Sequence, residues 1–528
     1  MLQITQLKLP YTHSQEDLEN KIRKTLKLSP KQAITYQITK KSIDARKKPE
    51  LFLVYSCDVS CDNEEAIVKK AKNTSITMVK KTSYQLPERG TEKLNHKPLI
   101  IGAGPAGLFA AFVLVEAGFQ PILLERGKAV EQRTKEVVHF WETGVLLPDS
   151  NVQFGEGGAG TFSDGKLNTV VKDPVNRNQF VLETFVRFGA PGQILYENKP
   201  HIGTDILCQV ITNMRNYLLE KGAEIHFETC ATDFEIENHK ITKVICNNHM
   251  EFYVSTVVLA LGHSARDTFQ RLYQLNVPME VKNFAVGFRV EHPQAMINDS
   301  LYGKQNIKMP AAPYKVTSNF PNGRGVYSFC MCPGGFVVNS SSEENHLVVN
   351  GMSYSKRDSS TANSAIIVSV NTSDFGGDDP LAGMRYQQAL EKKAYSLANG
   401  KIPQQLYGDY CANRISKEYG DFTSNAKGLT ELSNLRGLLN SDIEESFMGG
   451  MQHFARFIPN FDRKDAILSG IESRTSSPLR ILRNENYESM IQGLYPCGEG
   501  AGYAGGITSA AMDGIKVAEA IIKKYKPN

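Results

Sequence analysis

The sequence lacks the features of a membrane-spanning or exported protein. Its 528 residues contain no uninterrupted apolar run of about 18 residues, the length that a spanning helix needs. Residues 1–10 lack the long apolar core of a signal peptide. The nine cysteines are scattered without the spacing of a disulfide framework, which favours free thiols in a reducing compartment. We therefore expect a soluble, cytoplasmic protein with no membrane association.

The chain also lacks an excess of one charge. A formal net charge of +4 is small for this length and argues against nucleic-acid binding. Histidines and cysteines form no cluster with metal-ligand spacing, so we expect no metal site. Hydrophobic residues at 41% and charged residues at 22% are ordinary for a globular protein, and the length predicts roughly two to four folding units. The oligomeric state stays open.

Hydrophobic periodicity divides the chain into four segments. Residues 1–86 follow a β-α-β-β-α-β order, which is typical of a ferredoxin-like α+β domain. After a polar linker, residues 97–284 read as the first part of a doubly wound, Rossmann-like α/β domain that is completed by residues 489–528. Residues 285–488 between them are first strand-rich and antiparallel and then helical, which predicts an inserted substrate or cap domain. Five basic residues are expected at the tip between the middle strands of the first domain: Lys40, Lys41, Arg46, Lys47 and Lys48.

A dinucleotide fingerprint opens the second segment. A short apolar strand precedes a GxGxxG turn, an apolar helix follows, and a second strand ends in an acid roughly 20 residues further on. The first glycine permits the tight turn, the second lets the backbone approach a pyrophosphate, and the third lets the helix pack on the strand. The helix N-terminus then offers N–H groups to the phosphates, and the acid can accept hydrogen bonds from ribose hydroxyls. The residues assigned to this site are Gly102, Gly104, Pro105, Ala106, Gly107, Glu125 and Arg126.

Two later segments distinguish FAD from NAD. A buried strand ends in Ala260-Leu261-Gly262, and a strand near the C-terminus enters a Gly-rich loop at Gly498-Glu499-Gly500 that leads into a helix. In this order the motifs resemble the superfamily of FAD-dependent oxidoreductases related to glutathione reductase. The resemblance implies FAD as cofactor, with the late acid beside its ribityl or pyrophosphate part and the last helix aimed at the flavin. It assigns Gly262, Gly498, Glu499, Gly500, Gly505, Gly506 and Ile507 to the cofactor.

Nearly the whole chain is similar to the bacterial FAD-dependent dehydrogenases described as NAD(FAD)-utilising. The segments that carry this resemblance are residues 42–49, 154–167, 330–335 and 472–478. The family name implies flavin and redox chemistry but supplies no substrate, electron donor or electron acceptor.

Residues 155–166 are the most unusual stretch besides the fingerprint. They resemble the Gly-rich segment that passes the flavin N5 edge in the succinate dehydrogenase and fumarate reductase branch of the superfamily. The glycines let backbone N–H groups approach a ring, and the alternative is an anion-binding turn or a plain loop. The resemblance places Gly158, Thr161, Ser163, Gly165 and Lys166 at the flavin, with Lys166 also a catalytic candidate.

Other reactive residues give weaker signals. Arg474 is the first choice, ahead of Arg480 and Arg483, for an arginine that clamps a substrate carboxylate or stabilises reduced flavin, and it is the second catalytic candidate. Cys330 and Cys332 form a CxC on a predicted strand, which places both thiols on one face, and buried unreactive thiols are favoured over a redox pair. His263 is interpreted as a turn histidine, although it follows a buried strand end.

The leading functional interpretation is an FAD-dependent oxidoreductase that moves a hydride through flavin N5 to or from an unidentified small molecule. Because the chain lacks a second GxGxxG, NADH or NADPH could bind only transiently at the flavin face. Two alternatives stay open. The basic tip of the first domain could recruit RNA for a flavin-dependent modification, or the flavin could belong to a regulatory protein without turnover.

Overall fold

In the computed structural model, which describes residues 1–29, 31–71 and 73–527, the N-terminal unit is a four-stranded sheet with two helices. Its strands follow the order β2-β3-β1-β4, and the β2–β3, β1–β3 and β1–β4 pairs are antiparallel. Leu18, Ile22 and Leu26 bury one helix face against this sheet, as their spacing predicts. The elements come in the expected order: β1 (Leu2–Pro10), α1 (Gln15–Leu26), β2 (Ile34–Lys47), β3 (Glu50–Cys61), α2 (Glu64–Ala71) and β4 (Ile76–Met78).

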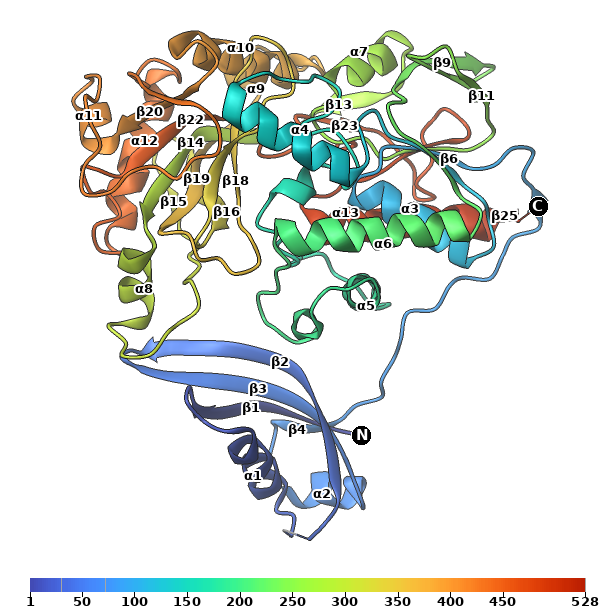
Figure 1. Ribbon diagram of the computed structural model, residues 1–528. Coiled ribbons are helices and arrows are strands. Elements are labelled where there is room, and N and C mark those ends of the chain that lie inside the picture. Colours follow the sequence, from blue (N-terminus) through green and yellow to red (C-terminus); the bar gives the residue numbers. More distant parts are fainter. Residues whose placement is uncertain (30, 72, 528) are drawn as a thin grey trace.

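The hairpin β2–β3 reaches the rest of the molecule, and the position of its basic residues differs from the expectation (Figure 1). Lys41 lies inside strand β2, where its backbone N–H donates to the Tyr196 carbonyl at 2.7 Å. At the turn, the Lys48 ammonium donates to the Ser300 carbonyl at 2.5 Å, and Arg46 is paired with Asp44. The prediction of one basic tip is therefore correct only in part: Lys40 and Lys41 lie within β2, whereas Arg46, Lys47 and Lys48 lie at the exposed end of the hairpin.

The second unit is built on a five-stranded, wholly parallel sheet in the order β24-β12-β6-β7-β8. The C-terminal strand and helix complete the fold that the fingerprint begins, since β24 pairs with β12 beside β6. The strands are β6 (Leu99–Ile101), β7 (Ile122–Leu124), β8 (Glu224–His226), β12 (Val257–Leu259) and β24 (Leu494–Pro496). The helices and short helical turns are α3 (Pro105–Glu116), α4 (Val130–Thr143), η1 (Ala159–Phe162), α5 (Arg177–Arg187), η2 (Gly192–Leu195), α6 (Thr204–Glu220), α7 (Arg266–Gln274) and α13 (Ile507–Lys524).

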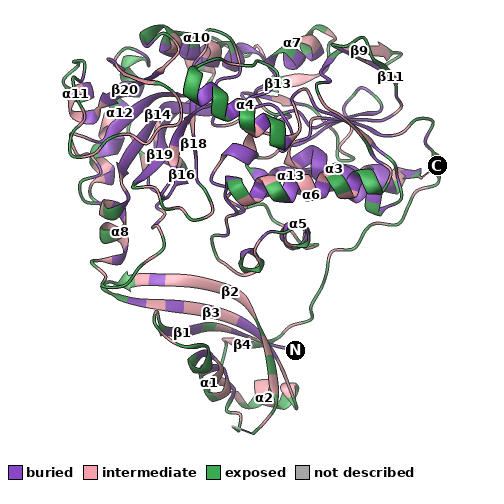
Figure 2. Ribbon diagram, in the orientation of Figure 1, coloured by how far each residue is buried: buried purple, intermediate pink, exposed green. Residues whose placement is uncertain are grey.

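The two faces of this sheet are covered differently. Ile100 and Val258 point to a core shared with α3, α5, α6 and α13, and α3 is buried almost all round (Figure 2). Leu99 and Leu259 point to the opposite face, which is covered by α7 and a three-stranded antiparallel sheet. That sheet consists of β9 (Ala231–Glu237), β10 (Lys240–Cys246) and β11 (Glu251–Tyr253). The Rossmann-like half is therefore present, but a small antiparallel sheet takes much of the area that crossover helices cover in a doubly wound fold.

The third unit contains a seven-stranded sheet in the order β15-β16-β19-β14-β22-β20-β21, in which only the β20–β21 pair is parallel. Alternate side chains of β14 such as Phe288 face helices α10–α12, whereas Arg289 and Glu291 face the other way and are fully buried. Its strands are β14 (Phe284–Pro293), β15 (Thr317–Asn319), β16 (Gly325–Cys332), β19 (Thr361–Val370), β20 (Ile402–Leu406), β21 (Thr430–Leu432) and β22 (Ile467–Glu472). Its helices are α8 (Gln294–Tyr302), α9 (Thr372–Phe375), α10 (Ala382–Leu397), α11 (Tyr407–Cys411) and α12 (Ser441–Phe454).

Three short two-stranded sheets join these units. The hairpin β17 (Phe336–Asn339) and β18 (Val349–Met352) extends the third unit, where Gly351 lies against Arg289. Strands β13 (Met279–Val281) and β23 (Leu479–Ile481) pair where the chain enters and leaves the third unit. The polar linker contains β5 (Glu92–Lys93), which pairs with β25 (Tyr525–Lys526). Within the described ranges, no helix combines the length and the apolar character that crossing a membrane requires.

Candidate functional site

The predicted cofactor segments meet at one edge of the parallel sheet. The fingerprint turn follows β6, Glu125 follows β7, Gly262 follows β12 and the late Gly-rich loop follows β24. Because all four strands are parallel, these segments leave the sheet at its carboxyl edge, where open α/β sheets bind ligands.

The three fingerprint glycines have different structural tasks. Gly102 has a φ of +105°, and a Cβ there would lie 2.5 Å from the Ala260 carbonyl oxygen. A Cβ at Gly107 would lie 1.8 Å from the Gly102 carbonyl oxygen, so this glycine lets α3 pack on the turn. Gly104 differs, because its φ of −76° suits any residue and its Cβ would make only an ordinary contact of 3.8 Å with Gly158. The first and third glycines are thus required by the fold, and the second leaves the helix end accessible.

Glu125 holds the turn together. Its carboxylate is buried and accepts backbone N–H groups from Ala103 at 2.9 Å, Gly127 at 3.0 Å and Gly155 at 2.9 Å. Two of these bonds go to Oε1 and one to Oε2, so Oε2 keeps one lone pair for a further donor such as a ribose hydroxyl. The ribose role stays a prediction, and the structure adds a second task, which is to join the fingerprint to the loop at residues 151–158.

A buried arginine that the motifs did not reveal organises this loop. Arg133 lies on α4 with no solvent exposure, and burial lowers the pKa of its guanidinium to about 10. It donates to the carbonyls of Asn151 at 2.8 Å, Val152 at 2.9 Å, Glu156 at 2.7 Å and Gly158 at 3.0 Å. The sequence signal is its place on the apolar stripe of the helix, in register with Val130, Val137, Phe140 and Trp141.

The Gly-rich loop passes between the N-termini of two helices. Gly158 would place a Cβ 3.1 Å from the Gly104 Cα at the start of α3, and Gly160 would place one 2.9 Å from Ile507 at the start of α13. The N-caps of these helices, Gly104 and Gly506, make no side-chain capping hydrogen bond. Two helix ends with partial positive charge therefore flank the loop.

The loop side chains predicted to contact the flavin mostly bond within the protein. Thr161 is buried and accepts a long contact of 3.4 Å from Arg133, while Ser163 donates to the Gly160 carbonyl at 2.7 Å and accepts from the Gly165 N–H at 3.0 Å. Lys166 is about one third exposed and lies 3.0 Å from Asp164. A flavin contact by backbone groups and Lys166 stays a prediction.

The late loop brings an acid and a histidine together. Glu499 lies 2.9 Å from Nδ1 of His263, and its other oxygen accepts the Gly506 N–H at 3.3 Å. Burial raises the pKa of the Glu499 carboxyl, but His263, the Gly506 N–H and Lys282 outweigh it, so the net shift is downward. His263 lies in a turn, as interpreted, and only the tertiary structure shows that Glu499 is its partner.

These residues fit FAD. A Cβ built on Gly262, Gly505 or Gly506 would meet nothing within 4 Å, so the backbone lies open at the points where the cofactor was predicted. Gly498 and Gly500 instead permit close packing, since their Cβ atoms would lie 2.8 Å from Ala106 and 2.1 Å from the Leu261 carbonyl oxygen. Nε2 of His263 is buried and has no partner among the described residues. Open backbone, two uncapped helix ends and an unpaired ring nitrogen suit a ligand with a pyrophosphate and many acceptors.

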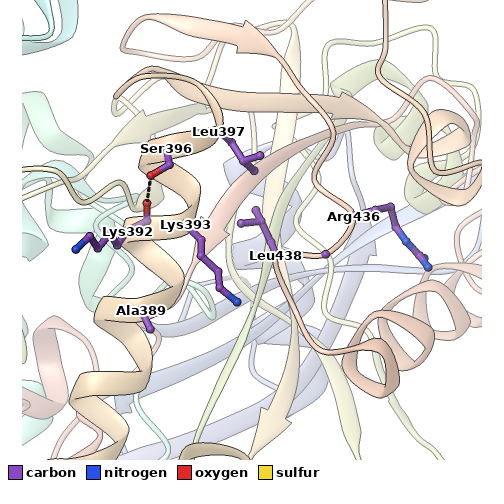
Figure 3. Close-up of a pocket in the computed structure, with 8 residues that line it drawn as sticks. Ala389, Lys392, Lys393, Ser396, Leu397, Arg436 and Leu438 are labelled. Carbon is purple, nitrogen blue, oxygen red and sulfur yellow. Dashed lines mark hydrogen bonds between the residues drawn. The ribbon is translucent and has the colours of Figure 1, made fainter.

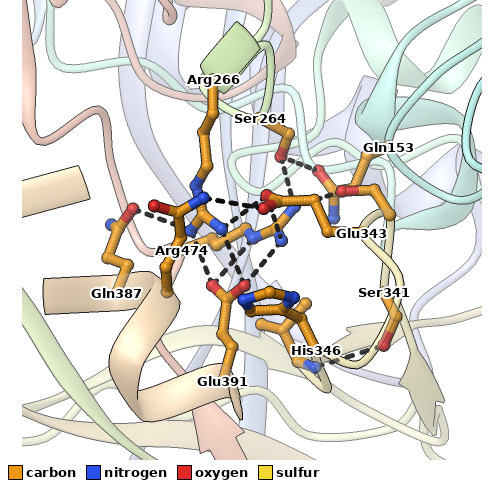
Figure 4. Close-up of polar contacts among 12 residues, drawn as sticks. Gln153, Ser264, Arg266, Ser341, Glu343, His346, Gln387, Glu391 and Arg474 are labelled. Carbon is orange, nitrogen blue, oxygen red and sulfur yellow. Dashed lines mark hydrogen bonds and ion pairs between the residues drawn. The ribbon is translucent and has the colours of Figure 1, made fainter. Parts of the chain in front are cut away.

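The two predicted arginines, Arg126 and Arg474, both bond within the protein. Arg126 stacks over the Phe154 ring with its guanidinium carbon 4.3 Å from the ring centroid, and it donates to Asp267 at 2.9 Å. Arg474 is buried in a network with Glu391, Arg266 and Glu343 (Figure 4).

All of the Arg474 nitrogens have protein partners. Nε and Nη2 donate to Glu391 at 3.0 and 2.7 Å, and Nη1 donates to Ser264 at 2.9 Å and Ser342 at 2.6 Å. The two arginines beside Glu391 hold the pKa of its buried carboxyl far below the usual range. This geometry favours a role for Arg474 in positioning the turn at Ser264. Direct contact of Arg474 with a substrate stays a prediction, and the placement does not favour it.

The CxC pair was predicted on one strand face, and this is wrong. A β-bulge between Phe329 and Cys332 breaks the alternation, with Cys330 at a φ of +41°. Cys332 is therefore fully buried, whereas Cys330 is exposed. The buried Arg289, which is paired with Glu472 at 2.8 Å, donates to the Cys330 carbonyl at 3.0 Å and supports the bulge.

A surface cavity of about 500 Å³ lies elsewhere, beside α10 (Figure 3). Its lining includes Lys392, Lys393, Leu397 and Leu438, and none of the predicted cofactor residues contributes to it. The convergence of segments at the sheet edge, rather than this cavity, defines the candidate site.

Comparisons with known proteins identify the family. A family described as "FAD-dependent protein, C-terminal domain-like" matches residues 283–475, and a domain of unknown function matches residues 1–60. A protein of Clostridium beijerinckii, described as an uncharacterized protein, is 44% identical over 514 residues, which cover 96% of each chain.

The chain is distantly similar to several solved structures. A glycine oxidase from Bacillus cereus is 11% identical, with 81% of this chain and 95% of that chain covered and a TM-score of 0.31. A glycerol-3-phosphate dehydrogenase from Bacillus halodurans, complexed with FAD, is 11% identical, with coverage of 81% and 64% and a TM-score of 0.36. An L-proline dehydrogenase from P. horikoshii is 14% identical, with coverage of 83% and 94% and a TM-score of 0.32.

Proposed function

This chain belongs to the family of the Clostridium beijerinckii protein, and because residues 283–475 match the FAD-dependent C-terminal domain, we propose that it is an FAD-dependent oxidoreductase. FAD is the cofactor. When bound, it supplies a ring that accepts a hydride at N5 and releases electrons to a second molecule. The proposal further includes a small molecule as the substrate or electron acceptor, and NADH or NADPH as a transient electron donor.

One observation carries the proposal. The Gly-rich loop lies between the uncapped N-termini of α3 and α13, with Gly158 against Gly104 and Gly160 against Ile507. The end of α3 suits the pyrophosphate, and the end of α13 suits the pyrimidine edge of a flavin, where reduction places negative charge. A helix end there stabilises the reduced form by about 0.3–1 kcal/mol when it is exposed and by more when it is buried.

The protein residues have the following tasks in this proposal. Arg133 and Glu125 hold the loop and the fingerprint turn in one arrangement, which keeps the N-terminus of α3 beside the loop without rearrangement. His263 and Glu499 form a hydrogen-bonded pair at the start of α13, where they can bind the polar ribityl chain. The third unit excludes water from the sheet edge through the buried network around Arg474.

The test is an absorption spectrum of the purified protein, followed by anaerobic addition of NADH, NADPH or candidate substrates. We expect the two visible bands of an oxidised flavin, and we expect them to bleach with one of these reductants. Bands that bleach with none of them would support the regulatory alternative. A protein that is colourless and does not take up added FAD would refute the proposal.

A further inference from the structure

Two cationic side chains meet at Asp164 beside the end of the Gly-rich loop, and a third, Lys199, lies on the segment that pairs with this end of the loop. Lys166 lies at the end of that loop, Lys199 on the segment between η2 and α6, and Arg357 between β18 and β19. Arg357 and Lys166 both pair with the buried Asp164, through Arg357 Nε at 2.9 Å and Lys166 Nζ at 3.0 Å. Lys166 also donates to the Met331 carbonyl of β16, so the cluster joins the parallel-sheet unit to the third unit.

Among the described residues, Asp164 is the carboxylate that pairs directly with this cluster, and it cannot satisfy all of the donors. Asp164 accepts hydrogen bonds from Nε and Nη2 of Arg357, and Nη1 of Arg357 makes no bond to this carboxylate. Within the described part of the chain, Lys199 has no carboxylate within 4.0 Å. His201, two residues further on, has a buried Nδ1 without a partner there, while its Nε2 lies 3.1 Å from the Ser355 carbonyl.

The surplus of positive charge affects the titration of the neighbouring groups. Partial burial, then Lys166 and Arg357, lower the pKa of Lys199. Burial first and then Arg357 lower the pKa of His201, and only Asp164 and the Ser355 carbonyl oppose this. Glu197, the other carboxyl near Arg357, is partly buried, and burial raises its pKa. An anion placed among these groups would relieve their mutual repulsion.

The cluster adjoins the helix end that the proposed function assigns to the flavin. Leu167, which follows Lys166, accepts a hydrogen bond at its carbonyl from the Thr508 hydroxyl in the first turn of α13, at 3.0 Å. Arg357 is held at a φ of +48°, a conformation that costs energy in a residue with a side chain and is retained where the surroundings require it.

We propose that Lys166, Lys199 and Arg357 bind the carboxylate of an organic acid, and that the substrate of the flavin site belongs to this class. The inference rests on the proposed function. A planar carboxylate matches the free edge of a guanidinium together with an ammonium group, and these charge-assisted hydrogen bonds are the strong ones. Arg474, whose donors all bond within the protein, leaves this task to Arg357.

The experiment titrates the full-length protein, loaded with FAD, with acetate, succinate, benzoate and inorganic phosphate at a constant ionic strength. The flavin difference spectrum and calorimetry report binding separately. The variants are Lys199→Gln, which breaks no ion pair, and Arg357→Gln. Lys135→Gln is the matched control, because Lys135 is exposed on α4 and lies outside the cluster.

We expect at least one carboxylate to give a saturable flavin difference spectrum. Its Kd should rise at least tenfold in K199Q and R357Q and stay unchanged in K135Q. Binding of phosphate but of no carboxylate, or an unchanged Kd in K199Q, would overturn the inference. If the protein takes up no flavin, the proposed function is refuted. If calorimetry of that flavin-free protein still shows carboxylate binding that is lost in K199Q, the anion site is supported independently.

Discussion

Gly104→Ala should separate cofactor binding from folding. The glycine has a φ of −76°, and the added methyl would make an ordinary 3.8 Å contact with Gly158. The free energy of unfolding of the FAD-free protein should therefore change by less than about 1 kcal/mol. The methyl stands where the pyrophosphate must approach the backbone, and overpacking of one methyl costs about 1–3 kcal/mol. The Kd for FAD should rise by about 5- to 150-fold.

Two other glycines provide the matched controls. At Gly107 a Cβ would lie 1.8 Å from a backbone oxygen, so Gly107→Ala should destabilise the protein itself. At Gly192 a Cβ would meet nothing within 4 Å, so Gly192→Ala should change neither stability nor FAD binding. The assay combines urea unfolding of the FAD-free proteins with a fluorescence titration of FAD.

The order of the three variants tests the reasoning. If G104A binds FAD as tightly as the wild type, the helix end of α3 is not the place where the cofactor comes closest. If G104A loses as much stability as G107A, the space around Gly104 is not open as described, and the binding result carries no information on the pyrophosphate.

The remaining predictions concern buried charges. Arg133→Met should lower the free energy of unfolding by about 3–5 kcal/mol in urea, because it strands the loop carbonyls, and a loss below 1 kcal/mol would contradict its anchoring role. Glu391→Gln should cost a similar amount, because it leaves Arg266 and Arg474 buried without a carboxylate, and stability equal to the wild type would refute the network. Burial raises the pKa of Glu156 from 4.5 to about 7, so the native state holds an extra proton between these values. The stability of the wild type relative to Glu156→Gln should therefore be greatest below pH 4.5 and fall as the pH rises to 7, and a constant difference would contradict the shift.

The sequence by itself determines the cofactor half of this protein. The spacing of Gly102, Gly104, Gly107 and Glu125 predicts a strand, a turn, a helix and a second strand. Gly107 meets a steric limit within the motif itself, whereas the limit at Gly102 comes from the distant Ala260 carbonyl. The element order of the N-terminal unit is likewise local, since it follows from periodicities of two and 3.6 residues. The match to an FAD-dependent family agrees with the cofactor that these motifs predict.

The tertiary structure alone decides which polar side chains remain available. Arg474 has the right chemistry for a clamp, but the fold surrounds it with Glu391, Ser264 and Ser342. Arg357 lies far from every motif in the sequence, and only the meeting of the loop with β16 and β18 brings it to Asp164. Strand alternation predicts Cys330 and Cys332 on one face, but a β-bulge between Phe329 and Cys332 breaks the alternation. Hydrogen-bond partners and bulges depend on contacts between distant segments, and the periodicity of one segment contains no information about them.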